Sequence, residues 1–192
     1  MPLGFHKATL FGVAGVSATG DVVLLHDQDY TNATSVSITS GINSTYGEYI
    51  FRFYNINPAT DNAEFEFQAG SGYNTTMTTT VFATDHNESD STAEVGYKTS
   101  NDQAQGTSYQ WIAKNVGSDA DQNLGGELHL FSPSSTTYAK QFYLTVNNMV
   151  GSDYTQNYFV AGYFNTTSAL TQVDFKMSTG NFDGTIKMWG VK

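Results

Sequence analysis

Short segments in which apolar and polar side chains alternate with a period of two constrain the fold of this chain most strongly. Residues 63–69 show the alternation most cleanly, with Phe65 and Phe67 on one side and Glu64, Glu66 and Gln68 on the other. Such alternation indicates a β-strand with one buried and one solvated face, because successive side chains of a strand point to opposite sides. About eleven segments show strand character: residues 22–26, 35–39, 49–56, 63–69, 75–83, 109–116, 127–131, 141–150, 158–164, 173–178 and 185–191.

Residues 49–56 form the segment with the bulkiest side chains. One face carries Tyr49, Phe51 and Phe53, and the other carries Ile50, Arg52, Tyr54 and Ile56. A strand with large side chains on both faces is typical of the middle of a sheet, so we expect this one to be central.

The composition supports strands and turns rather than helices. Thr, Tyr and Phe favour strands, Asn, Gly and Ser favour turns, and good helix formers are scarce. A chain of 192 residues suffices for one sizeable core, which 13 Phe and 12 Tyr can fill. The sequence therefore predicts an all-β protein, a single antiparallel β-sandwich that is jelly-roll-like. We expect the sandwich domain over residues 21–192, after an N-terminal arm over residues 1–20.

Three finer expectations concern local structure. Residues 86–107 lack alternation and are expected to be the longest irregular stretch, with one helical turn near residues 91–96. Residues 173–178 and 185–191 are expected to pair as a hairpin, because Asp183-Gly184 is a turn signal. Glu64 and Glu66 are expected on the solvated face of their strand.

The charge balance is strongly acidic, with 18 acidic and 8 basic residues and a formal net charge of −10. Binding to nucleic acid or to anionic lipid relies on clustered Lys and Arg, so neither is an expected partner. The absence of cysteine excludes disulfides, thiolate metal sites and cysteine nucleophiles. No apolar run reaches the roughly 18–20 residues that a membrane-spanning helix needs.

The residue patterns of common enzymes and metal sites are missing from the sequence. There is no G-x-S-x-G nucleophile elbow, and the four histidines form neither H-x-H nor HExxH. Glu64 and Glu66 offer a carboxylate pair for glycoside hydrolysis, but two solvated acids of an amphipathic strand are the simpler interpretation. The acidic cluster in residues 85–90 has ligands that suit Ca²⁺, although acidic surface loops produce such clusters by chance. We expect no enzyme activity, no cofactor and no metal centre.

Saccharide binding is a further interpretation, since exposed aromatic rings stack on sugar faces and side-chain amides bind hydroxyl groups. Tyr46, Tyr73 and Tyr154 lie in predicted turns and are the candidate glycan-binding residues. Trp111 and Trp189 lie in predicted strands, where packing in the core or at an interface is the expected role.

Several long phrases of the sequence carry a resemblance to a group of proteins. They are residues 56–61 (INPATD), 78–90 (TTTVFATDHNESD), 119–142 (DADQNLGGELHLFSPSSTTYAKQF), 160–169 (VAGYFNTTSA) and 173–192 (VDFKMSTGNFDGTIKMWGVK). Together they resemble virion structural proteins of marine, cyanophage-like tailed bacteriophages, over residues 38–192. The resemblance implies a component of a phage particle and implies no catalytic residue.

These observations predict a non-enzymatic structural protein on the exterior surface of a tailed-phage virion, in the first place a capsid decoration or cement subunit. The alternative is a tail, vertex or fibre module that binds a host surface glycan. The expected partners are other virion proteins and further copies of the chain, in a homo-oligomer such as a trimer. The residues predicted to form the assembly interface are Leu3, Phe5, Leu10 and Phe11 of the arm, and Trp189.

Overall fold

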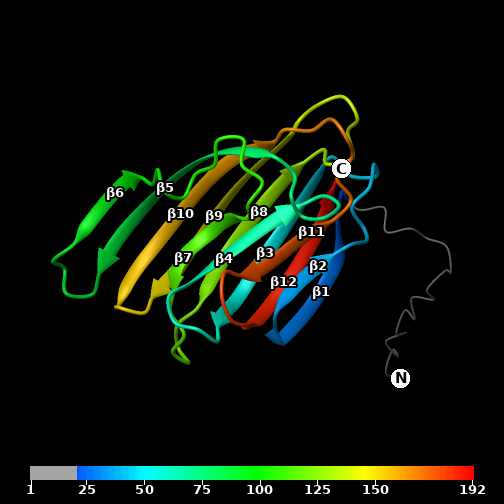
Figure 1. The fold of residues 1–192 in the computed structure, drawn as a ribbon. Helices are drawn as coiled ribbons and strands as arrows, with labels where there is room; N and C mark the ends of the chain where they lie inside the picture. The colour runs from blue at the N-terminus through cyan, green and yellow to red at the C-terminus, as the bar shows by residue number, and fades with distance from the viewer. Residues whose placement is uncertain (1–20) are drawn as a thin grey trace, which may run out of the picture.

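A computed structural model describes residues 21–192, which form twelve β-strands joined by turns and loops (Figure 1). All strand pairs are antiparallel. The predicted arm, residues 1–20, lies outside the described residues. The strands are β1 Val22–Ala33, β2 Ser35–Ile38, β3 Glu48–Pro58, β4 Ala63–Ala69, β5 Met77–Asn87, β6 Ala93–Tyr97, β7 Gln110–Val116, β8 Leu124–Phe131, β9 Lys140–Val150, β10 Tyr154–Phe164, β11 Val173–Met177 and β12 Phe182–Val191.

The strands form two layers that are joined at one point. The large layer has the order β1-β12-β3-β8-β9-β10-β5-β6, and the small layer has the order β2-β11-β4-β7. The layers meet where Val116 of β7 pairs with Val150 of β9. The predicted all-β antiparallel sandwich is therefore confirmed, and β3 lies in the middle of its sheet, between β12 and β8.

Aromatic side chains fill the space between the two layers. The ring of Phe175, from β11, lies 5.5 Å from the ring of Phe51 and 5.3 Å from that of Phe53, both from β3. Phe65 and Phe67 of β4 complete this cluster, and all five side chains are buried. The alternation in the sequence thus places one face of each layer in a common core, where burial of apolar area stabilises the fold.

A β-bulge changes the face on which Ile56 lies. The pairing of β3 with β8 shifts register between Phe53 and Ile56, and Asn55 there has a φ of 51°. The extra residue moves Ile56 to the inner face, where it is fully buried. The prediction that Ile56 shares a face with Arg52 is therefore wrong.

Two further local predictions are also wrong. Residues 93–97 form strand β6 rather than a helical turn, because they pair with β5 from His86 to Phe82. Strands β11 and β12 do not form a hairpin, because β11 pairs with β4 and β2 in the small layer while β12 pairs with β1 and β3 in the large one. The turn between them carries the chain from one layer to the other.

One end of the large layer extends beyond the small one. The small layer ends at β7, whereas the large layer continues through β10, β5 and β6, which project to the left in Figure 1. Strand β6 is exposed along most of its length. The edge of β7 and the segment 98–109 that leads into it consequently border an open region of the sandwich.

Candidate functional site

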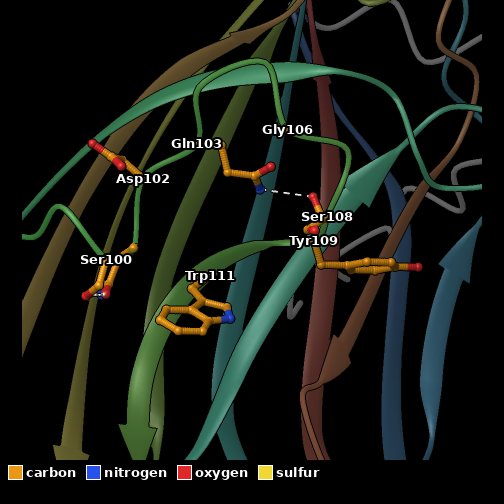
Figure 2. A pocket seen from close by; sticks show the side chains of 8 residues that line it. Ser100, Asp102, Gln103, Gly106, Ser108, Tyr109 and Trp111 are labelled. Carbon is orange, nitrogen blue, oxygen red and sulfur yellow. Dashed lines mark hydrogen bonds between the residues drawn. The ribbon is translucent and has the colours of Figure 1, made fainter.

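The candidate site is a hollow of about 340 Å³ at the start of β7, between Trp111 and the loop that precedes it (Figure 2). We call it the Trp111 hollow. Side chains that offer hydroxyl, amide and carboxylate groups surround one large aromatic ring. The lining residues are Ser100, Asn101, Asp102, Gln103, Gly106, Ser108, Tyr109 and Trp111.

The loop over the hollow is anchored by backbone and side-chain hydrogen bonds. Gly106 and Met77 exchange two backbone hydrogen bonds of 2.8 and 3.0 Å. The backbone N–H of Gln103 donates to Thr79 Oγ1 at 2.9 Å, and Gln103 Nε2 donates to the carbonyl of Ser108 at 3.0 Å, the dashed line of Figure 2. The bonds to Met77 and Thr79 tie the loop to β5, and the bond from Gln103 to Ser108 joins two parts of the loop itself.

The indole of Trp111 is held from its own sheet. The carboxylate of Glu66, the residue that pairs with Trp111 on β4, lies beside it. Lys176 Nζ lies 3.2 Å from Glu66 Oε1, and Lys114 Nζ lies 5.1 Å from the centroid of the Trp111 ring. Burial raises the pKa of Glu66, and Lys176 opposes this shift. The predicted solvated position is therefore wrong for Glu66, which Lys176 and Trp111 cover.

Tyr109 also lines the hollow, but its ring points toward the small layer (Figure 2). Its hydroxyl donates to Asp174 Oδ2 at 3.0 Å, and Ser37 Oγ donates to Asp174 Oδ1 at 2.5 Å. Burial raises the pKa of Asp174, and burial with the neighbouring Asp174 raises that of Tyr109. The carboxylates of Glu66 and Asp174 are thus occupied by donors of their own sheet, and neither lines the Trp111 hollow.

A second hollow, of about 460 Å³, lies at the other end of β7 and includes Tyr154. Asp85 lies in its wall, 2.9 Å from Lys98 Nζ, and accepts a hydrogen bond from Gln156 Nε2. Gln156 Oε1 is buried without a hydrogen-bond partner. A neighbouring hollow of about 350 Å³ shares Tyr154 and adds His86, Asn147 and Thr155.

The structure separates the three tyrosines predicted to bind glycans. Tyr154 lines the two hollows just described. Tyr46 packs edge-on against Tyr49 at 5.9 Å and against the core, so its ring is partly covered. Tyr73 lies in the turn after β4 with a φ of 50° and lines none of the three hollows. Trp111, for which the strand position predicted packing, instead lines the Trp111 hollow.

The outer face of the large layer carries a second candidate surface. Phe159, Phe82 and Tyr97 lie directly opposite one another on β10, β5 and β6, and the rings of Phe82 and Phe159 stack at 4.8 Å. Val95 of β6 lies on the same face and is 74% exposed. We call these four residues the outer patch.

Trp189 lies on the same outer face, at the opposite end of the large layer. The guanidinium carbon of Arg52 lies 5.5 Å from the Trp189 ring centroid, and the side chain is half-buried beside Ile50 and Val22. The other residues predicted for assembly, Leu3, Phe5, Leu10 and Phe11, lie outside the described residues.

Neither a metal site nor a membrane span was found in the described part of the chain. Between residues 21 and 192, no three His, Asp or Glu side chains gather as ligands of one metal ion. The same residues include no helix with the length and hydropathy needed to cross a membrane.

Comparison with known proteins gives no relative. No protein-family model matches the sequence, and no curated protein and no solved structure matches it. The resemblance to phage virion proteins consequently stays a prediction from the sequence.

Proposed function

We propose that this chain is a non-enzymatic structural protein on the exterior of a tailed-phage particle, a capsid decoration subunit that acts by packing against neighbouring virion proteins. The observation that carries the proposal is the outer patch. Three aromatic rings and Val95 are exposed side by side on a projecting part of the sheet. Contiguous apolar surface of this kind marks interaction sites, because water contact with it is unfavourable.

The charges of the same face are suited to burial. Lys187 Nζ lies 3.0 Å from Asp27 Oδ2, and Arg52 Nε lies 3.1 Å from Glu127 Oε2. These pairs are already formed within the sheet, so a neighbouring subunit that covers them leaves no isolated charge without a partner. An unpaired buried charge would weaken an interface strongly.

The acidic charge and the resemblance support the exterior position. A net charge of −10 disfavours contact with packaged DNA, whose phosphates attract basic surfaces. The arm with Leu3, Phe5, Leu10 and Phe11, together with Trp189, belongs to the proposed assembly surface, and a homo-oligomer such as a trimer is the proposed state. The second candidate, a tail, vertex or fibre module that binds a host glycan, is favoured by the hollows at the ends of β7.

The decisive experiment is the copy number of the chain per purified particle, measured by quantitative mass spectrometry against the major capsid protein. We expect hundreds of copies, as a decoration of the capsid lattice requires. A few to a few dozen copies would place the chain at a tail, vertex or fibre and overturn the capsid assignment. Absence from the particle would overturn the structural role altogether.

A binding experiment tests the outer patch itself. Particles stripped of the protein are mixed with the wild-type chain or with the double variant Phe82→Ala/Phe159→Ala. We expect the double variant to lose recruitment to the particles. The matched control is Tyr138→Ala, which removes an exposed aromatic ring of the loop before β9. Equal recruitment of all three proteins would show that the outer patch is not the interface.

A further inference from the structure

We infer that the Trp111 hollow binds a neutral saccharide, whose ring stacks on the indole and whose hydroxyl groups bind the surrounding loop. This inference does not rest on the capsid position proposed above, because saccharide binding is a property of the isolated chain. The site was not predicted from the turn tyrosines, and none of Tyr46, Tyr73 and Tyr154 lines it.

The chemistry of the lining favours a saccharide. The face of an aromatic ring is electron-rich, and it attracts the polarised C–H groups on the apolar face of a sugar ring. Around the indole, the loop offers the side chains of Ser100 and Gln103, which suit a ligand with several hydroxyl groups. Ligand sites commonly combine one apolar wall with a few fixed polar groups that set orientation.

Asp102 stands at the rim of the hollow, with its carboxylate directed away from Trp111 (Figure 2). Its Oδ2 atom accepts a hydrogen bond of 2.5 Å from the hydroxyl of Tyr97. Hydrogen bonds to sugar hydroxyls are therefore assigned to Ser100 and Gln103, whose hydroxyl and amide groups can both donate and accept.

The charge of the chain disfavours anionic ligands. Lys114, whose Nζ lies 5.1 Å from the Trp111 ring centroid, is a cation beside the hollow, but the lining includes Asp102 and no Lys or Arg, and the whole chain carries a net charge of −10. A uronic acid, a sulfated sugar or a phosphate would be repelled by this field. Neutral hexose or pentose chains fit both the polarity and the sign of the site.

The hollow is also preorganised, which lowers the entropy that binding must overcome. Glu66 lies beside the Trp111 indole on the neighbouring strand, and the Gly106–Met77 bonds fix the loop. An aromatic ring that is already oriented loses little freedom when a ligand stacks on it. A structural role alone would not require the indole to border an open hollow.

The two tryptophans of the chain allow a direct test by fluorescence. Trp111 and Trp189 are the only tryptophans, so the variant Trp189→Phe reports Trp111 alone and Trp111→Phe reports Trp189 alone. Each variant is titrated to millimolar concentration with cello-, manno-, malto- and xylo-oligosaccharides, and with oligogalacturonate as the anionic counterpart. We expect at least one neutral series to change the emission of Trp111 and none to change that of Trp189.

Affinity measurements by calorimetry on further variants locate the site. We expect Trp111→Ala to weaken binding at least about tenfold, and Tyr138→Ala to leave it unchanged. Thermal unfolding of each variant verifies that it is folded. The titration of the wild-type chain tests saccharide binding even if a variant does not fold.

The inference is overturned if no neutral saccharide changes the Trp111 emission or binds the wild-type chain. It is equally overturned if oligogalacturonate binds as tightly as the neutral series, or if Tyr154→Ala abolishes binding while Trp111→Ala does not. Because the particle copy number is measured independently, failure here leaves the capsid proposal standing, and failure there leaves saccharide binding standing.

Discussion

Replacement of Phe175 by alanine gives the sharpest test of how the two layers are held together. Phe175 comes from β11 of the small layer and is fully buried. Its ring contacts Phe51 and Phe53 across the core, and Phe65 and Phe67 beside it, with ring centroids 5.3 to 6.4 Å apart. The variant removes the one ring that all four neighbours share.

The expected loss follows from these contacts. A buried Phe→Ala substitution lowers the free energy of unfolding by about 3–5 kcal/mol, the lost transfer energy plus a cavity term. Four aromatic neighbours place Phe175 at the upper end, near about 4–5 kcal/mol, since aromatic pairs contribute beyond their buried area. At this chain length each kcal/mol corresponds to about 2–4 °C in Tm, so we expect Tm to fall by roughly 8–20 °C.

The assay is urea unfolding followed by circular dichroism, with Phe159→Ala as the matched control. Phe159 is 38% exposed on the outer face and stacks on Phe82 alone. Its loss is therefore expected to lower the free energy of unfolding by only about 0.5–1.5 kcal/mol. Equal destabilisation by Phe159→Ala and Phe175→Ala would refute the assignment of inner and outer faces, and so would a wild-type stability in Phe175→Ala.

Two other predictions concern a close backbone approach and a buried acid. Gly126→Ala should lower the free energy of unfolding by about 1–3 kcal/mol in urea titrations, because its Cβ would lie 2.6 Å from Val146 Cα and against the Thr145 carbonyl; an unchanged midpoint would contradict this packing. Asp174 has a pKa raised above 3.8 by burial, so the folded state keeps its proton in a pH window where the unfolded state has lost it. The free energy of unfolding that this group contributes is therefore lost as pH rises through that window. Urea titrations across the window should show a smaller loss of stability in Asp174→Asn than in the wild type. Identical pH profiles of stability for the two proteins would contradict the burial of Asp174.

The strands that alternate could be predicted because burial of one face leaves a periodic trace in the sequence. Phe65 and Phe67 are core residues in the structure, as their alternation indicated. Strand β6 leaves no such trace, since most of its side chains are exposed. Only its pairing with β5 makes it a strand, and pairing is a long-range property.

The candidate site shows the same division. Tyr154 could be singled out as an aromatic residue in a turn, and it lines two hollows. The sequence could not single out Trp111 as a site residue, because a position within a strand is equally compatible with packing in the core and with an open sheet edge. That β7 is the last strand of the small layer, and that residues 100–108 fold over its start, follows from the order of strands.

The sequence by itself determined the all-β class, most strand positions, the acidic surface and the lack of any thiol chemistry, because composition and period-two alternation are local properties. Tertiary structure alone decided that β11 and β12 lie in different layers, that a bulge turns Ile56 into the core, and that Glu66 is buried beneath Lys176 and Trp111. Each of these depends on which strands become neighbours. Strand neighbours are chosen by the packing of the whole chain, and no local pattern records that choice.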